Sequence, residues 1–201
     1  MSDGDGASPR SSSPLGRPRS EQSRIAVLRA TSELLRENGL RAMTTEQIAA
    51  RSGASKATIY KWWPNKYAVA VDAFLSEMLA DSPDPDTGSA RRDFTVLLSG
   101  LFHFYTGPSG RVFAQLVGEA QFDPDVAMAL RDGLIHPRRE QLETMWDRGV
   151  ARGELSADVD RGTAIDLIIG PTLYRLMVGH GALDDAAAAV IVETALHGLT
   201  A

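Results

Sequence analysis

The sequence contains no cysteine among its 201 residues. Disulfide bonds, thiolate metal sites and cysteine nucleophiles are therefore excluded, and the absence fits a reducing compartment. The sequence also lacks an uninterrupted apolar run of membrane-spanning length, because its longest apolar stretch, near 164–183, contains Asp166, Arg175 and His180. The N-terminus has no apolar segment of the kind that a secretory signal requires. We therefore expect a chain that acts in the cytoplasm and does not enter a membrane.

Catalytic and metal-binding motifs are also missing. The 4 histidines are dispersed, and none belongs to an HExxH motif or a similar ligand spacing. The glycines of GPSGR at 107–111 do not follow a strand, so this stretch predicts a turn rather than a phosphate-binding loop. We expect no enzymatic activity, no cofactor and no metal site.

Lysine is scarce and confined to one place. Its three copies, Lys56, Lys61 and Lys66, all lie in GASKATIYKWWPNK at 53–66, together with two of the three tryptophans. Residues 1–66 carry 11 lysines and arginines against 6 acidic residues, a net charge of +5, whereas the rest of the chain carries 10 against 20, a net charge of −10. A basic first part predicts contact with a polyanion. Chance clustering of charge is the alternative.

Helical periodicity dominates the sequence, and no segment alternates as a strand does. We expect an all-α fold of about nine helices. The predicted helices lie at 21–38, 45–52, 55–63, 65–79, 89–106, 109–120, 123–151, 159–180 and 184–199. Pro124 and Pro137 predict a start and a kink or break in the seventh of these helices.

The predicted helices fall into two domains. Residues 1–20 are rich in Ser, Gly and Pro, which is typical of a disordered arm. Residues 21–81 form the first predicted domain. The stretch DSPDPDTGS at 81–89 marks the break, and residues 82–201 form the second domain.

The segment 44–63 has the layout of a helix-turn-helix, with two short helices joined by a tight turn. Thr44 and Gln47 stand at the spacing of a capping box. Gly53 permits the positive φ of a sharp turn. Ser55 is suited to cap the second helix.

The second helix of this unit has an inner and an outer face. Ile59 and Trp63 stand four residues apart, so they predict an anchor in the core. The outward side chains supply cations and hydrogen-bond donors for phosphate, and the first residues of such a helix reach base edges in the major groove. The predicted base readers are Thr45, Lys56, Ala57 and Thr58. The predicted phosphate contacts are Tyr60, Lys61, Trp62 and Lys66, and Thr44 and Ser55 complete the predicted DNA-binding set. A solvated helix with exposed aromatic side chains is the alternative.

The run TTEQIAARSGASKATIYKWWPNK at 44–66 resembles the helix-turn-helix signature of the TetR family of bacterial transcriptional regulators. The residues that carry the match are Thr44, Ile48, Ala49, Gly53, Thr58, Ile59, Tyr60, Trp63 and Lys66. The preceding ATSELLRENG at 30–39 is similar to the first helix of the family and its glycine stop. Trp62 departs from the pattern, since histidine is common at this place. The resemblance covers about 21–81 and implies a DNA-binding domain.

Two arginines precede this domain. Arg17 and Arg19 lie in GRPRS at 16–20. On an extended arm they would enter an adjacent minor groove, as basic arms of other proteins do. A disordered tail that happens to carry two arginines is the alternative.

The resemblance also implies a second domain that forms a homodimer and encloses a ligand cavity. The stretches ARGEL at 151–155 and IIGPTLYRLMVG at 168–179 resemble C-terminal domains of one TetR subgroup. Helices 164–180 and 184–199 are apolar around much of their circumference, as expected of helices between their own domain and a partner. The predicted interface residues are Ile165, Ile169, Leu173, Leu176, Val192, Leu196 and Leu199. Deep burial in a monomer is the alternative.

Aromatic and thioether side chains predict the lining of the ligand cavity. They are Phe102, Tyr105, Phe113, Phe122, Met145, Trp146, Tyr174 and Met177. Each of them is equally compatible with a place in the core. The acidic balance of the second domain favours a cationic effector or forms a solvated surface.

We therefore expect a dimeric repressor that binds a palindromic operator in the bacterial cytoplasm, at the nucleoid. An effector is expected to favour a conformer in which the fourth helix, near 65–79, has shifted, and so to release the DNA. The alternative is a helix-turn-helix regulator without a small-molecule effector, acting constitutively, as an activator, or under the control of a protein partner.

Overall fold

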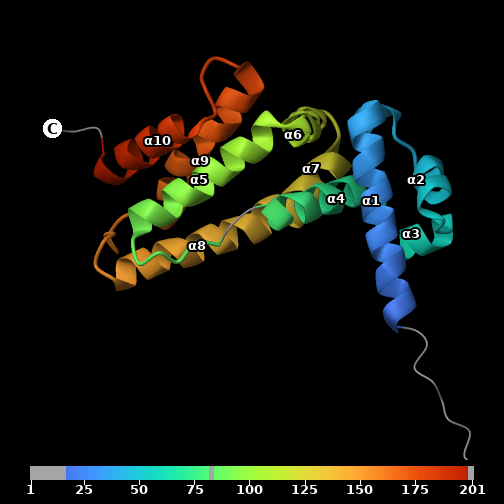
Figure 1. The fold of residues 1–201 in the computed structure, drawn as a ribbon, viewed down its shortest axis with the longest axis horizontal. Coiled ribbons are helices and arrows are strands. Elements are labelled where there is room, and N and C mark those ends of the chain that lie inside the picture. Colours follow the sequence, from blue (N-terminus) through green and yellow to red (C-terminus); the bar gives the residue numbers. More distant parts are fainter. Residues whose placement is uncertain (1–16, 82–83, 199–201) are drawn as a thin grey trace, which may run out of the picture.

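The computed structural model describes residues 17–81 and 84–198, and every regular element within them is a helix. The all-α prediction is confirmed for this part of the chain. Figure 1 shows the arrangement. The elements are α1 (Arg17–Ala42), α2 (Thr45–Ser52), α3 (Lys56–Trp62), α4 (Lys66–Asp81), α5 (Ala90–Thr106), α6 (Pro108–Glu119), α7 (Pro124–Leu130), the π-helical turn η1 (Arg131–Ile135), α8 (His136–Ala151), α9 (Arg161–Val178) and α10 (Asp185–His197). None of these helices is both long enough and apolar enough to cross a bilayer.

Helix α1 begins earlier than the sequence predicts. Residues 17–20 are expected in an extended arm, but α1 starts at Arg17, so Arg17 and Arg19 lie in its first turn. Pro18 stands in the same turn, where its missing N–H leaves no hydrogen bond unmade and its fixed φ suits a helix. Residues 1–16 lie outside the described residues, so the arm stays a prediction for them.

The main part of α1 ends at Gly39, as predicted. Its backbone leaves the helical region there, with φ 75° and ψ 168°, a conformation that favours glycine. Leu40 then turns into the core, and its N–H donates to Gln115 Oε1 on α6 at 3.0 Å. The end of α1 therefore also contacts the second domain.

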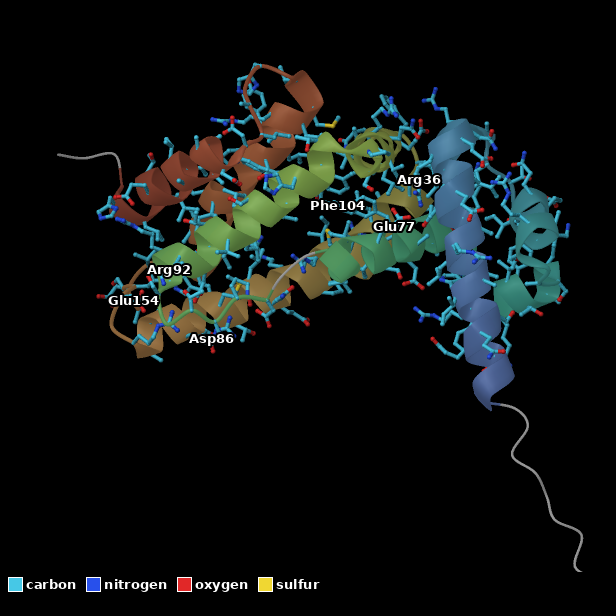
Figure 2. The ribbon with its side chains drawn as sticks, in the orientation of Figure 1. Arg36, Glu77, Asp86, Arg92, Phe104 and Glu154 are labelled. Atoms are coloured by element: carbon cyan, nitrogen blue, oxygen red, sulfur yellow. The ribbon has the colours of Figure 1, made fainter. Side chains whose placement is uncertain are left out.

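Helix α4 connects the two domains. On one side it packs against α1, where Arg36 Nη2 donates to Glu77 Oε1 at 2.5 Å and Arg24 Nη2 to Asp72 Oδ2 at 3.1 Å (Figure 2 labels Arg36 and Glu77). On the other side it packs against α6, α7 and η1 of the second domain. Figure 1 shows α2 and α3 on the far side of α1 from the rest of the molecule. A movement of α4 would therefore reach α1 and, through it, the helix-turn-helix.

Helix α5 is the centre of the second domain. It contacts α6, α8, α9 and α10, and Figure 1 shows it between α8 and the pair α9–α10. Its apolar stripe, which includes Phe94, Leu97, Leu98 and Phe102, is buried. The core of this domain is therefore built around one helix that neighbours cover on several sides.

The helices α7 and α8 form one continuous run through η1. The run starts at Pro124 in the first turn, as predicted, and the π turn directly precedes Pro137. Pro137 has no N–H for the fourth carbonyl before it, and its ring crowds that carbonyl. The backbone widens instead, and the N–H of His136 bonds to the carbonyl of Arg131. With this run counted once, the described residues contain the nine helices that the sequence predicts.

Candidate DNA-reading surface and candidate effector cavity

Local hydrogen bonds fix the shape of the α2–α3 unit. Gln47 N–H donates to Thr44 Oγ1 at 3.2 Å, and Thr44 N–H donates to Gln47 Oε1 at 2.9 Å, which completes the predicted capping box. Gly53 has φ 72°, in the left-handed region, and its N–H bonds to the carbonyl of Ala49. Ser55 Oγ accepts from the N–H of Thr58 at 3.1 Å and begins α3. Both short helices are therefore positioned by contacts within four residues.

Two buried side chains anchor α3 to the domain core. Ile59 and Trp63 are both buried, as predicted. Trp63 Nε1 also donates to Asp72 Oδ2 on α4 at 3.0 Å. Asp72 accepts from Arg24 on α1 as well. The carboxylate of Asp72 thus connects α1, α4 and Trp63, the residue that follows α3.

The opposite face of α3 is exposed and carries five of the twelve predicted DNA contacts. Tyr60 is 51% and Trp62 is 42% exposed, although both are large aromatic side chains. Lys56, Ala57 and Lys61 are exposed beside them. An outward surface of two aromatic rings and two lysines suits phosphate oxygens and base edges.

Three predicted contacts have other tasks in this structure. Thr45 is buried, because it lies on the inner side of the first turn of α2. Thr44 and Ser55 are exposed, but the oxygens of their side chains already cap helices. In this structure they are therefore caps of α2 and α3.

Lys66 also differs from expectation. Its ammonium donates to the carbonyls of Leu40, Arg41 and Met43 at 3.3, 3.2 and 3.0 Å. These carbonyls follow the end of the main part of α1 and have lost their helical partners. The position of Lys66 therefore indicates a capping task between α1 and α4 rather than the predicted phosphate contact.

Sequence reasoning overlooked Glu46 as part of this surface. Lys56 Nζ lies 2.7 Å from Glu46 Oε1 on α2. The hydrogen bond from Lys56 lowers the pKa of Glu46, and the same contact raises the pKa of Lys56. Both side chains are exposed, so this carboxylate competes directly with any phosphate or base for the lysine. The contact joins residues in different helices, and helical periodicity gave no signal for it.

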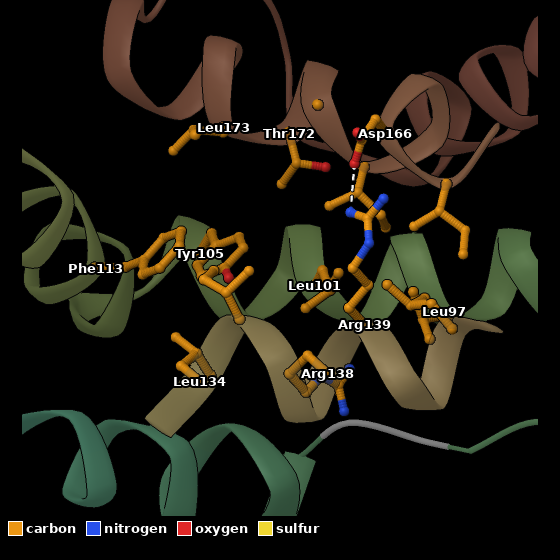
Figure 3. Close-up of a pocket in the computed structure, with 15 residues that line it drawn as sticks. Leu97, Leu101, Tyr105, Phe113, Leu134, Arg138, Arg139, Asp166, Thr172 and Leu173 are labelled. Atoms are coloured by element: carbon orange, nitrogen blue, oxygen red, sulfur yellow. Dashed lines mark hydrogen bonds and ion pairs between the residues drawn. The ribbon is translucent and has the colours of Figure 1, made fainter. Parts of the chain in front are cut away.

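A cavity of about 290 Å³ lies between α5, α8 and α9 in the second domain (Figure 3). Its lining is mainly apolar. The apolar part includes Leu97, Leu101, Leu134, Leu142, Ile165 and Ile169. The volume falls near the lower end of the range usual for small-molecule sites, about 300 Å³.

Few polar groups line this cavity. Thr172 is 3% exposed, and its Oγ1 makes no hydrogen bond. Arg139 Nη1 and Asp166 Oδ1 form an ion pair at 2.6 Å between α8 and α9, drawn as a dashed line in Figure 3. Tyr105 is buried, and desolvation raises the pKa of its hydroxyl. Within residues 17–81 and 84–198 no cluster of His, Asp and Glu could hold a metal ion.

Two of the eight predicted cavity residues line it. Tyr105 and Phe113 stack with ring centroids 5.0 Å apart, and Phe113 stacks in turn on Phe74 of α4 at 5.4 Å. Tyr105 and Phe113 belong to the wall, whereas Phe74 belongs to the connecting helix. A continuous column of three rings therefore joins the cavity to α4.

The other six predicted cavity residues lie elsewhere. Phe102, Met145 and Trp146 are core residues on faces that do not meet this cavity. Phe122 is 85% exposed, because it lies in the turn between α6 and α7 rather than on a packed helix face. Tyr174 and Met177 are exposed because they point away from the domain on α9.

The predicted interface residues are also distributed differently. Ile165 and Val192 are buried inside the chain, and Ile169 and Leu173 line the cavity. Leu176 and Leu196 are partly buried, and Leu199 lies outside the described residues. Of the predicted residues that the structure describes, Leu173 alone is exposed. The other large apolar side chains that α9 and α10 expose are Leu167, Tyr174, Met177, Val178 and Val190.

Comparisons with known proteins bear on both regions. A family model described as bacterial regulatory proteins, tetR family, matches residues 27–73, and one described as tetracyclin repressor-like, C-terminal domain, matches residues 84–195. The chain is 40% identical to the uncharacterised HTH-type transcriptional regulator YdeS of Bacillus subtilis, over 92% of this chain and 94% of that protein. It is 30% identical to the DNA-binding transcriptional repressor TetR of Mycobacteroides abscessus, over 89% of this chain and 94% of that protein. The crystal structure of the TetR family transcription regulator SCO0332 superposes with a TM-score of 0.80 at 34% identity, covering 90% of this chain and 100% of that chain.

Proposed function

The chain belongs to the TetR family of bacterial transcriptional regulators, and on this premise we propose that it is a homodimeric repressor that a small molecule releases from a palindromic operator. The observation that carries the proposal is the packed connection between an exposed helix, α3, and a mainly apolar cavity in the second domain. Helix α4 is common to both, since Asp72 holds α3 and Phe74 stacks on the cavity wall.

The DNA contacts are assigned to the outer face of α3. Lys56, Ala57 and Thr58 in its first turn read base edges, and Glu46 competes with the DNA for Lys56. Tyr60, Lys61 and Trp62 in its second turn contact phosphates. Arg17 and Arg19, in the first turn of α1, approach the DNA as part of that helix.

Dimerisation is assigned to the outer faces of α9 and α10. Leu167, Tyr174 and Val178 follow one another at helical spacing, and all three are exposed. Val190 is exposed on α10, which packs beside α9. A second copy of the chain is the occupant that the family makes plausible, because two recognition helices are needed to read a palindrome. Val178→Glu is expected to produce a monomer in light scattering, whereas Met128→Glu on α7 leaves a dimer.

Release is assigned to a shift of α4. The cavity wall meets α4 through the ring column and through η1, where a Cβ on Gly133 would lie 3.0 Å from Val71 Cγ1. Leu134 and Ile135 of the same turn line the cavity. A ligand that displaces either part of the wall therefore displaces α4, and with it α3 through Asp72.

Repression is supported by the named repressor among the relatives. The proposed place of action is the bacterial cytoplasm, at the nucleoid.

The test is fluorescence-anisotropy binding of the full chain to its own upstream intergenic DNA and to unrelated DNA, across a salt series. Sequence-selective binding with two chains per site is expected. Tyr60→Phe and Lys61→Ala are expected to lower the affinity for both DNAs. Arg92→Ala, a substitution at an exposed position on α5, is expected to change neither affinity. Selective binding with one chain per site would contradict the dimer, and equal binding to both DNAs would contradict operator recognition at this site.

A further inference from the structure

The cavity between α5, α8 and α9 has a composition that restricts the chemistry of its ligand. Its volume is about 290 Å³, roughly twice that of a ~150 Å³ apolar cavity that holds benzene. Leucine and isoleucine side chains make up most of the wall. The space therefore suits a compact apolar body of about two fused rings.

One polar atom of the wall has no partner. Threonines in helices commonly return their hydroxyl to the carbonyl four residues earlier, and this chain does so at Thr31, Thr95 and Thr144, at 2.8, 2.7 and 3.0 Å. Thr172 in α9 does not, although it is almost completely buried. Figure 3 shows its hydroxyl oxygen on the cavity side of α9. A buried hydroxyl without a partner is disfavoured, so a ligand that supplies an acceptor there gains affinity.

The charged groups at the wall are either paired or directed away from the cavity. Arg139 lies against Asp166 and also donates to the carbonyl of Gly162 at 2.9 Å. Arg138 donates to Gln141 Oε1, and Figure 3 shows its guanidinium on the side of α8 that faces α4, so its stem is the part that meets the cavity. Tyr105 is neutral at neutral pH, and burial raises the pKa of its hydroxyl further. A charged ligand would therefore lose its hydration without gaining a free counter-ion.

We propose that the effector is an uncharged, mainly apolar two-ring-sized molecule with a carbonyl-type acceptor that takes a hydrogen bond from the Thr172 hydroxyl. This inference rests on the proposed function, because it names the chemistry of the site to which the release is assigned. It replaces the cationic effector that the acidic balance of the domain favours. Most acidic side chains of the domain are on the surface, the buried Asp93 bonds to Thr87 and Arg152, and the one carboxylate of the wall, Asp166, is paired.

The experiment compares four probes of one shape by calorimetry on the full chain. 2-Acetylnaphthalene carries the acceptor, 2-ethylnaphthalene lacks it, 2-naphthoate is an anion and 2-naphthylmethylammonium is a cation. We expect the ketone to bind about fivefold more tightly than the hydrocarbon, as one neutral hydrogen bond allows. The two ions are expected to bind more weakly than either neutral probe.

Variants locate the contact. Thr172→Val keeps the shape and removes the hydroxyl, so the preference for the ketone should disappear while the hydrocarbon binds as before. Thr144→Val removes an exposed hydroxyl on α8 that already bonds to Glu140, and it should leave the preference unchanged. Equal binding of ketone and hydrocarbon to the original chain, or tightest binding of an ion, would overturn the inference.

DNA binding in the same samples separates the two proposals. If the chain binds DNA selectively and none of the probes binds, the ligand class is wrong and the regulator assignment stands. If the ketone binds through Thr172 and DNA affinity does not change, the ligand class stands and release through this cavity is wrong.

Discussion

The indole nitrogen of Trp63 donates to Asp72 at 3.0 Å, and this bond ties the recognition helix to the helix that leaves the DNA-reading domain. The same carboxylate accepts from Arg24 at 3.1 Å. The position of α3 is therefore coupled to α1 and α4 through one side chain.

Asp72→Ala is expected to lower both the stability of the first domain and its affinity for DNA. The change leaves the Trp63 N–H without its acceptor and the Arg24 guanidinium with Glu21 alone, a loss of about 2 kcal/mol in the free energy of unfolding. Trp63→Phe removes only one of the two bonds. A double-mutant cycle by chemical denaturation should therefore be non-additive, and simple additivity would exclude a direct contact.

Lys66→Met separates capping from phosphate contact. The three carbonyls at the end of α1 lose their donor, so the free energy of unfolding falls by about 2 kcal/mol. The slope of DNA affinity against salt should stay as it is, since no phosphate contact is lost. Lys61→Ala should do the opposite, reducing the slope by about one unit with little change in stability. A reduced slope for Lys66→Met would restore the phosphate assignment.

Glu46→Gln is expected to raise the affinity for operator and unrelated DNA alike, by about threefold at low salt. The reason is that Lys56 loses a competing carboxylate. Anisotropy titrations against operator and unrelated DNA test this. If the variant instead loses its preference for one base pair, Glu46 reads that base pair directly.

Gly133→Ala tests the contact between η1 and α4. The added methyl group would lie 3.0 Å from Val71 Cγ1, so the two elements must separate slightly. We expect about a fivefold change in DNA affinity, which corresponds to about 1 kcal/mol. Val71→Ala in the same chain makes room for the methyl group and should restore the affinity. An effect that persists in the double variant would place its cause elsewhere.

The shape of the α2–α3 unit was largely predictable because its determinants are local. Caps at Thr44 and Ser55 and the left-handed turn at Gly53 act within four residues, so their spacing is visible in the sequence. The carbonyl bonds of Lys66 were not predictable, for the complementary reason. Its carbonyl partners lie more than twenty residues earlier in the chain, and a charge alone does not identify its partner.

The cavity and the proposed interface were harder to predict because α9 is apolar on several faces at once. Ile168 faces the core, Leu173 the cavity and Tyr174 the outside, although all three are large and mainly apolar and lie within ten residues. Periodicity finds an apolar stripe but does not say what covers it. Thr172 gave no signal either, since only the fold shows that its hydroxyl has no partner.

The hydrogen bonds that shape α2 and α3 come from Thr44, Gln47 and Ser55, and the anchors are Ile59 and Trp63. The outward positions 56, 57, 60 and 61 contribute little to that frame. They can therefore change one at a time during evolution without loss of folding, and duplicated copies of such a gene can acquire new target sites while keeping the same scaffold.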